Sequence, residues 1–255
     1  MVESNKGYPI EIKDLNKKFG SINVLRDFNL TIEAGDFVAI VGRAGTGKST
    51  LLRMIAGLDS LDSGSLKVNG NEISGVDKTI RTVFQKANLL PWRNIIKNVI
   101  FGTVDKNEAA AAQILEKVGL INKKYEWPKI LTDGEKQRVS LARALAGNPK
   151  IVLLDDPLGT LDVLTKMDIQ HVIEKLWLEM GFTAVLVTHD VSEAARLANR
   201  VILLDKNNVT MDLQITLPRP RLKDNDTGYF EQYIFNKLME EENIQAESVN
   251  WQCDI

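Results

Sequence analysis

The chain has 255 residues, 44% of them hydrophobic, which is enough for one large α/β domain or two small ones with a buried core. Its 32 lysines and arginines nearly balance 34 aspartates and glutamates, so a broad basic surface for duplex nucleic acid is excluded. The one cysteine, Cys253, excludes intramolecular disulfides and cysteine-based metal sites and fits a reducing compartment.

The first residues, MVESNKGYPIEIKD, contain no apolar core of a signal peptide. No stretch approaches the roughly 18 apolar residues that a membrane-spanning helix needs. If the protein works at a membrane, we therefore expect another chain to hold it there.

Short apolar runs alternate with longer helical ones along the chain, an order typical of a mostly parallel sheet covered by helices. The predicted strands are, in chain order, Ile10–Leu15, Asp36–Val41, Ile80–Phe84, Ile151–Asp155, Thr183–Thr188 and Arg200–Leu204. Runs such as IVLLD and AVLVT are apolar on both alternating faces, which predicts central strands buried beneath helices on either side.

Helical periods replace the strand signal in residues 86–149. This stretch includes the alanine-rich segment Ala109–Ala112 and an amphipathic run after Asp133, so we predict a helical insert. The tail, residues 224–255, predicts a peripheral helix and a frayed end. Its acidic cluster is Glu240, Glu241 and Glu242. The residues with helix-like spacing are Tyr233, Ile234, Leu238 and Met239.

A glycine-rich segment, GRAGTGKS at residues 42–49, fits the pattern G-x-x-x-x-G-K-[ST] between the strand FVAIV and the helical run STLLRMIAG. Its glycines let the backbone N–H groups point at phosphate oxygens, and the following helix directs its positive dipole end at the same anion. Lys48 would reach the β- and γ-phosphates, and the Ser49 hydroxyl would ligate Mg²⁺. The predicted phosphate-binding residues are Gly42, Arg43, Ala44, Gly45, Thr46, Gly47, Lys48, Ser49 and Thr50. This loop alone does not distinguish a kinase from a GTPase or a transport ATPase.

Polar residues follow two of the predicted central strands, at the sheet edge where ligands bind. After IVLLD, Asp155 is placed to hold the Mg²⁺ shell and Asp156 to polarise the water that attacks the γ-phosphate. After AVLVT, a ring nitrogen of His189 could meet the γ-phosphate or that water. The other histidine, His171, lies inside a predicted helix and is expected to be structural only.

The segment LTDGEKQR at Leu131–Arg138, shortly before the acid pair, makes the chain resemble the ATP-binding subunits of ABC transporters. The resemblance covers nearly the whole chain, with Gln85 as the Q-loop glutamine, LGTLD at residues 158–162 as the D-loop and His189 as the switch histidine. It implies a P-loop NTPase fold of the α/β class with a RecA-like core, an antiparallel β-subdomain and an inserted α-helical subdomain. The nucleotide-binding domain would span residues 1–222, with the helical part at about 86–149, followed by a C-terminal helix and tail at 223–255.

The resemblance also implies a mechanism that spacing alone does not supply. Two subunits would pair head to tail, with each ATP held between one phosphate loop and the other subunit's signature segment. Thr132 and the backbone N–H of Gly134 would contact the γ-phosphate across that interface. Phe19 would stack on adenine, and Gln85 would serve both catalysis and the Mg²⁺ shell. The implied cofactors are ATP and Mg²⁺.

The implied partners are a second ATPase subunit, membrane permease subunits and, through the complex, an extracytoplasmic solute-binding protein, with no nucleic acid. The subunit would lie peripherally on the cytoplasmic face of the inner membrane. Segment 86–92 would transmit closure to the permease, while the alternative for Leu89, Leu90 and Trp92 is packing inside the helical insert. The stretches NLLPW, YEWPKIL, GFTAVLVTHDVSEA and DLQITLPRPR resemble the branch that imports aliphatic sulfonates, with nitrate, bicarbonate and taurine importers as alternatives.

Two positions depart from the family pattern. Asp156 replaces the usual glutamate, which withdraws the carboxylate by roughly 1.5 Å, and a misplacement of about 1 Å can cost on the order of a hundredfold in rate. In the signature, Asp133 replaces a glycine and would be repelled by a phosphate oxygen about 5 Å away by roughly 3 kcal/mol at an effective dielectric of about 20. We therefore predict slow hydrolysis.

Two other functions compete with the transporter hypothesis. A hydrolysis-poor ATP-binding subunit would fit the two departures. A soluble ATPase of the same family, acting on ribosomes or in DNA repair, usually joins two such domains or carries a long coiled-coil insertion. This chain has neither feature, so the importer subunit is favoured.

Overall fold

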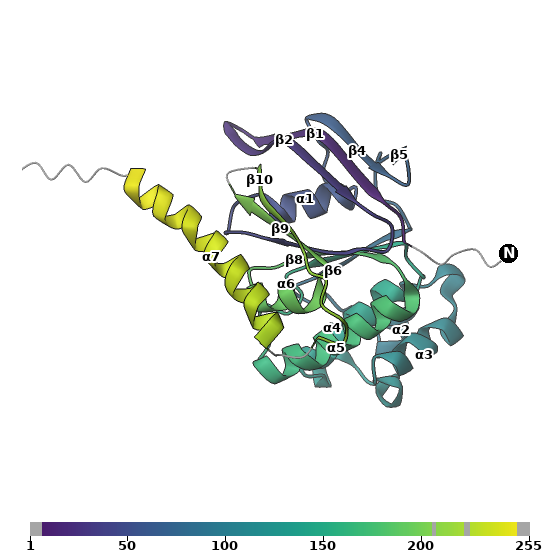
Figure 1. Cartoon of the computed structure of the whole chain (residues 1–255). Coiled ribbons are helices and arrows are strands. Elements are labelled where there is room, and N and C mark those ends of the chain that lie inside the picture. The colour runs from purple at the N-terminus through teal and green to yellow at the C-terminus, as the bar shows by residue number, and fades with distance from the viewer. Residues whose placement is uncertain (1–6, 206–207, 222–224, 249–255) are drawn as a thin grey trace, which may run out of the picture.

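The chain folds into two β-sheets with helices between and against them (Figure 1), in a computed structural model that describes residues 7–205, 208–221 and 225–248. The strands are β1 (Ile10–Phe19), β2 (Ile22–Ile32), β3 (Phe37–Val41), β4 (Ser63–Val68), β5 (Asn71–Glu72), β6 (Ile80–Phe84), β7 (Ile151–Asp155), β8 (Thr183–Val187), β9 (Arg200–Asp205) and β10 (Asn208–Gln214). The helices are α1 (Lys48–Ile55), α2 (Ile95–Ile100), α3 (Glu108–Lys117), α4 (Asp133–Leu145), α5 (Val163–Met180), α6 (Val191–Leu197) and α7 (Asn225–Ser248). Short 3₁₀ turns lie at Val104–Lys106, Ile121–Lys123 and Pro128–Ile130.

The larger sheet has the order β10-β9-β3-β8-β7-β6 and is parallel except for β10, which pairs antiparallel with β9 at one edge. Its central strands are apolar throughout because both faces are covered. In β3, Val38 and Ile40 belong to the core cluster that includes α1, while Phe37 and Ala39 belong to the cluster on the opposite face. All the parallel strands therefore end at one edge, where the polar residues that follow them gather.

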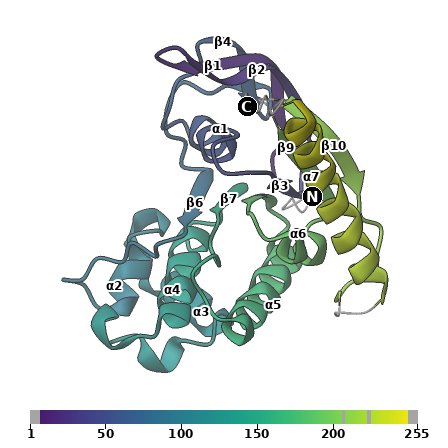
Figure 2. The ribbon, with the colours of Figure 1, turned by 90° about the vertical axis from the view of Figure 1, so that its left-hand side faces the viewer.

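The smaller sheet, with the order β2-β1-β4-β5, is antiparallel. Its inner face packs on α1: Ile10, Ile12 and Phe28 share a buried cluster with Leu51 and Leu52. The helix α1 thus lies between the two sheets, as both views show (Figures 1 and 2). This arrangement fixes the N-terminus of α1 against the carboxyl edge of the parallel sheet.

The opposite face of the parallel sheet is covered by α4, α5 and α6, whose apolar residues form one continuous cluster with those of α2 and α3. Residues 86–149 contain α2, α3 and α4 and no strand. The predicted run after Asp133 is the helix α4, and the alanine-rich segment lies in α3. The α/β fold with a parallel core, an antiparallel sheet and a helical insert is confirmed.

All six predicted strands are present, with small differences at their ends. β1 continues to Phe19, β3 begins at Phe37 instead of Asp36, β8 ends at Val187 instead of Thr188, and β9 continues to Asp205. IVLLD and the strand that precedes Thr188 occupy interior positions of the sheet, as expected from their two apolar faces.

Four strands, β2, β4, β5 and β10, were not predicted individually from the sequence. Each of the three longer ones, β2, β4 and β10, buries residues on one face only or lies at a sheet edge, so polar residues interrupt its apolar pattern. The strand β1 is also irregular, because its register with β2 shifts between Ile12 and Leu15, where Asp14 has φ 48°.

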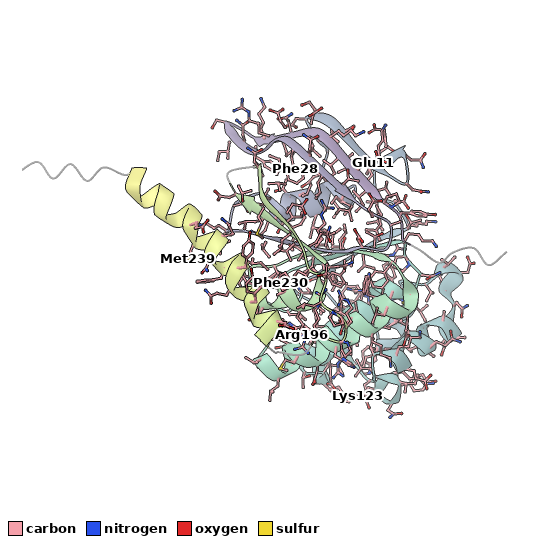
Figure 3. The ribbon with its side chains drawn as sticks, viewed as in Figure 1. Glu11, Phe28, Lys123, Arg196, Phe230 and Met239 are labelled. Carbon is pink, nitrogen blue, oxygen red and sulfur yellow. The ribbon has the colours of Figure 1, made fainter. Side chains whose placement is uncertain are left out.

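The C-terminal helix α7 extends away from the body of the molecule (Figure 1). Its first half packs on α6 through the buried Thr227 and Ile234, and Phe230, labelled in Figure 3, contacts the same cluster. The Ser192 hydroxyl donates a 2.7 Å hydrogen bond to Glu231 Oε1. The predicted tail contains the helix α7, while Cys253 and the side chains of Glu241 and Glu242 lie outside the described residues. No helix in the described ranges is both long and apolar enough to cross a bilayer.

Candidate active site

The phosphate loop follows β3 directly and leads into α1 at Lys48. Gly47 caps the helix in the left-handed conformation, with φ 94°, and a Cβ there would lie 2.9 Å from Val24 Cγ1. A Cβ at Gly42 would lie 2.2 Å from the Leu204 carbonyl oxygen. Both positions therefore require glycine, one for the tight turn and one for the close approach of β9.

The Lys48 ammonium lies inside the loop. Its Nζ donates a 2.8 Å hydrogen bond to the Gly42 carbonyl and another hydrogen bond to the Arg43 carbonyl. Burial lowers the pKa of Lys48, and the nearby Asp156 and Asp155 carboxylates partly oppose that shift. The positive charge is thus held at the N-terminus of α1, where the helix dipole also favours an anion.

Ser49 and Asp155, predicted to share a Mg²⁺ ion, lie together although they are far apart in sequence. The Ser49 hydroxyl donates a 2.9 Å hydrogen bond to Asp155 Oδ1. Ser49 lies in the first turn of α1, and Asp155 is the last residue of β7. A hydroxyl and a carboxylate are hard oxygen donors of the kind that Mg²⁺ takes beside phosphate and water, so the pair fits the ion.

Asp156, Gln85 and His189 also meet at this edge. Gln85 Nε2 donates a 3.1 Å hydrogen bond to Asp156 Oδ2, and His189 Nδ1 lies 3.2 Å from Asp156 Oδ1. The three residues follow β6, β7 and β8, which are neighbours in the sheet. The three predicted catalytic residues therefore form one cluster around Asp156, while their roles stay predictions.

The Asp156 carboxyl is held in a confined position. Its backbone has φ 47°, and its N–H donates a 2.8 Å hydrogen bond to the Val187 carbonyl. A Cβ at Gly159 would lie 2.5 Å from Asp156 Oδ2, so a larger residue in the D-loop would displace this carboxylate. Burial raises the pKa of Asp156, whereas His189 and Lys166 act in the opposite direction.

Phe19, predicted to stack on adenine, is the last residue of β1 and is exposed. It pairs with Ile22 across the turn of the β1–β2 hairpin, and Lys17 Nζ lies 5.2 Å from the centroid of its ring. The same hairpin contacts the phosphate loop through Val24, beside Gly47. The hairpin therefore carries an accessible aromatic ring beside the loop, and the stacking itself stays a prediction.

The signature residue Thr132 is the N-cap of α4. Its hydroxyl accepts a 3.2 Å hydrogen bond from the Glu135 N–H, and Glu135 Oε2 accepts a 3.1 Å bond from the Thr132 N–H. Lys123 Nζ binds the other oxygen of Glu135 at 2.5 Å, and this bond lowers the pKa of the Glu135 carboxyl. Because a hydroxyl that accepts one bond still has its own proton, Thr132 can also donate to a phosphate oxygen.

The two other signature positions have neighbours that the sequence did not reveal. The Asp133 side chain is 80% exposed and pairs with Lys136 Nζ at 2.8 Å, which offsets part of the repulsion expected from this carboxylate. Gly134 is buried, and a Cβ there would lie 2.4 Å from Thr165 Cγ2 on α5. Glycine is therefore required at position 134 for helix packing inside this subunit.

Two side chains of α4 hold the loop after β6, and neither was predicted from the sequence. Gln137 Nε2 donates a 2.9 Å hydrogen bond to the Phe84 carbonyl. Arg143 donates 2.8 Å bonds to the Ala87 and Asn88 carbonyls. On a predicted amphipathic helix such polar residues read as solvent-facing, and only the packing of α4 beside β6 brings them to the loop.

The segment predicted to contact a permease divides between the two alternatives. Leu89 is half-buried: it packs against the core and also lines an open surface groove, so neither alternative is excluded for it. Trp92 is 69% exposed. The backbone of Leu90 is held by the side chain of the buried Asn98, which binds its N–H at 2.7 Å and its carbonyl at 3.1 Å.

The phosphate loop and the signature segment lie in different parts of the chain's fold. The loop begins α1, between the two sheets, whereas the signature begins α4 on the opposite side of the parallel sheet (Figure 2). A groove of about 540 Å³ separates part of the signature from the D-loop. It is lined by Gln85, Lys86, Pro91, Asp133, Pro157 and Thr160, among others.

Comparison with known proteins identifies what this arrangement is similar to. The sequence profile of the ABC transporter family matches residues 25–159. The aliphatic sulfonates import ATP-binding protein SsuB of Zymomonas mobilis is 51% identical over 230 residues, covering 90% of this chain and 96% of that protein. The protein of the same name in Ralstonia nicotianae is 47% identical over 236 residues, covering 92% of this chain and 83% of that protein.

Among solved structures, a dimeric post-hydrolysis state of the ATP-binding cassette MJ0796 bound to ADP and Pi superposes with a TM-score of 0.72. It is 33% identical in sequence, and the match covers 82% of this chain and 100% of that chain. A second dimeric structure of MJ0796, described as a bacterial ABC transporter cassette, has a TM-score of 0.72 and 34% identity.

Proposed function

This chain belongs to the ABC transporter family, and on that premise we propose that it is the ATP-hydrolysing subunit of an importer for aliphatic sulfonates. The observation that carries the proposal is the 51% identity with the Zymomonas protein, which extends over nearly the full length of both chains. The positions of Gln85 and His189 beside the Asp156 carboxylate support the proposal that the subunit hydrolyses ATP.

The strand-end residues would bind and cleave ATP as follows. Backbone N–H groups of residues 42–49 and the Lys48 ammonium hold the phosphates at the N-terminus of α1. Ser49, Asp155 and Gln85 would hold Mg²⁺, which would supply charge neutralisation to the phosphates. The Asp156 carboxylate accepts a hydrogen bond from the attacking water and so orients it. His189, beside Asp156, contacts the γ-phosphate. Phe19 stacks on adenine.

Two copies would be needed for each complete site. In one chain the phosphate loop begins α1 and the signature begins α4, on opposite sides of the parallel sheet. Head-to-tail pairing brings Thr132 and the N–H of Gly134 to the γ-phosphate held by the other copy. The hydroxyl proton of Thr132 and the N-terminal dipole of α4 favour that contact. The MJ0796 cassette, similar in fold, is described as a dimer.

The permease would bind beside the helical part. The groove between the loop after β6 and residues 128–136, together with the exposed Trp92, offers an apolar surface for a loop of the membrane subunit. The α4 residues Gln137 and Arg143 hold the backbone of residues 84–88, so a movement of α4 on ATP closure reaches that surface. The subunit would lie on the cytoplasmic face of the inner membrane, and a solute-binding protein would deliver the cargo on the other side.

The division of the chain follows from these roles. Residues 1–222 would form the nucleotide-binding domain, with the helical part at about 86–149 inserted between β6 and β7. Residues 223–255 would form the C-terminal helix and tail. The packing of α7 on α6 supports a helix added to the edge of that domain.

A hydrolysis-poor subunit is the second candidate, because Asp156 is one methylene shorter than the family's glutamate. The structure reduces the second reason for it, since Lys136 pairs with Asp133. We expect slow hydrolysis that still supports transport.

Growth on an alkanesulfonate as sole sulfur source tests the proposal directly. A strain lacking this chain should fail to grow, the wild-type gene should restore growth, and Lys48→Ala should not, because the phosphates lose their cation. His171→Ala, on the exposed face of α5, is the matched control and should restore growth fully. Growth without the chain, or restored equally by Lys48→Ala, would refute the proposed function. The same growth test with taurine as sole sulfur source shows whether the chain serves a taurine importer instead.

A further inference from the structure

A buried acid lies behind the switch histidine and has no part in the site described above. Glu193, in α6, is 1% exposed, and its Oε1 is buried without a hydrogen-bond partner. Burial raises the pKa of Glu193 to about 7, with Asp190 and Asp156 adding to the shift and the Thr188 hydroxyl and Lys166 opposing it. An acid in such a place costs folding free energy, which suggests a use.

The bonds of Glu193 lead to the residue that precedes His189. The Thr188 hydroxyl donates a 2.5 Å hydrogen bond to Glu193 Oε2. The same hydroxyl oxygen accepts a 3.0 Å bond from the Asp190 N–H. Glu193 therefore fixes the rotamer of Thr188, and Thr188 fixes the turn across His189.

The residue that follows His189 is held as well. Asp190 Oδ1 accepts hydrogen bonds from the N–H groups of Ser192 and Glu193, at 3.1 and 3.2 Å, and so caps α6. Asp190 Oδ2 pairs with Lys166 Nζ of α5 at 3.1 Å. Both neighbours of His189 are thus tied to buried or capped groups.

The His189 ring itself gains little from packing. Its side chain is 65% exposed, yet Nδ1 lies 3.2 Å from Asp156 Oδ1. An exposed ring retains rotamer freedom unless its backbone is fixed, so the turn decides where the imidazole can reach.

We propose that Glu193 is a positioning residue that holds His189 against Asp156 through the Thr188 hydroxyl and the Asp190 N–H. The effect on hydrolysis rests on the proposed function of His189 and Asp156, whereas the effect on the position of the ring does not.

Histidine NMR of the full chain tests the positioning without nucleotide. The sequence has two histidines, so His171 on α5 is an internal reference, and His171→Gln assigns the two imidazole signals. Asp156→Asn defines the signal of His189 without its charged neighbour. At one fixed pH, Glu193→Ala and Thr188→Val should move the His189 signal toward that position and leave His171 in place.

Conservative variants separate position from charge and from folding. Glu193→Gln removes the charge but keeps the hydrogen-bonding shape, and Thr188→Ser keeps the hydroxyl, so both should retain the wild-type His189 signal. If Glu193→Gln moves the signal as far as Glu193→Ala, the effect is charge and the proposal is wrong. An unmoved signal in Thr188→Val also overturns it, and that variant serves if Glu193→Ala does not fold.

The ATPase of the assembled transporter gives the second readout. Displacement of His189 by about 1 Å should lower kcat by roughly 10- to 100-fold with little change in KM. The conservative variants Glu193→Gln and Thr188→Ser should keep a kcat close to that of the wild type. If the NMR signal moves and kcat does not, the positioning stands and the proposed role of His189 in hydrolysis fails.

Discussion

The two halves of the proposed composite site are built in different ways. The phosphate-binding half lies where β3, β6, β7 and β8 end, and backbone turns place its groups: a left-handed Gly47, φ 47° at Asp156 and the first turn of α1. The signature half is the start of one helix, α4. Side chains hold it, through the Thr132–Glu135 capping box and the packing of Gly134 on Thr165. Burial raises the pKa of Asp156 in the first half, whereas the bond to Lys123 lowers the pKa of Glu135 in the second.

That contrast predicts where the pH dependence of stability lies. The pKa of Glu193 is about 7 in the folded chain against an ordinary 4.5, so folding is penalised once the unfolded acid ionises. The penalty is absent below about pH 4.5, grows between pH 4.5 and 7 and is complete above pH 7, at about 3 kcal/mol. Glu193→Gln should flatten urea-unfolding free energies across this range by about that amount.

The matched control is Glu135→Gln in the signature half. The bond to Lys123 lowers the pKa of Glu135, so this variant should lose stability at neutral pH instead of becoming less sensitive above pH 4.5. Equal slopes for Glu193→Gln and the wild type would place the pH dependence elsewhere.

The shorter carboxylate of the strand-end half is the next test. Asp156→Glu should raise steady-state ATP turnover by about 10- to 100-fold, because the added methylene carries the carboxylate about 1.5 Å toward the γ-phosphate. The KM for ATP should stay nearly constant, since Lys48 and the loop bind the phosphates. Turnover that falls in the purified transporter would mean that the contacts with Gln85 and Gly159 are adapted to aspartate.

The signature half is expected to break by crowding. Gly134→Ala places a Cβ 2.4 Å from Thr165 Cγ2, and such overpacking costs about 1 to 3 kcal/mol. Thr165→Ser removes that methyl group, so the double variant should recover the thermal stability that Gly134→Ala loses. ATP-dependent dimerisation, measured by light scattering, then shows whether glycine serves the interface too. Recovery of stability without dimerisation means that it does.

The smallest expected effect concerns the exposed pair at the start of α4. Lys136→Ala should weaken ATP-dependent dimerisation by only a few fold, because exposed ion pairs contribute about 0.2 to 1 kcal/mol. The loss should vanish in an Asp133→Ser background, where there is no carboxylate to offset. A loss that persists there would assign Lys136 its own contact with phosphate or with the other subunit.

Much of the phosphate-binding half could be predicted from sequence because its geometry is local. A strand, a glycine-rich turn and a helix placed residues 42–49, and apolar strands ending in Asp155 and before His189 placed those residues at one edge. Alternating one-sided strands such as β2 and β10 were missed, since an exposed face interrupts the apolar pattern.

The class of fold, the phosphate loop and the polar residues Asp155, Asp156 and His189 at strand ends were predictable from the sequence, since each depends on patterns within a few residues. Three further contacts exist only in the folded chain: Gly134 packs on Thr165, Gln137 and Arg143 hold the loop after β6, and Glu193 is buried behind His189. Those contacts join helices to strands and loops elsewhere in the fold, or depend on which face of a short helix is buried. Local periodicity reveals neither kind of contact, because a polar residue gives the same sequence pattern whether its helix faces water or a neighbouring strand.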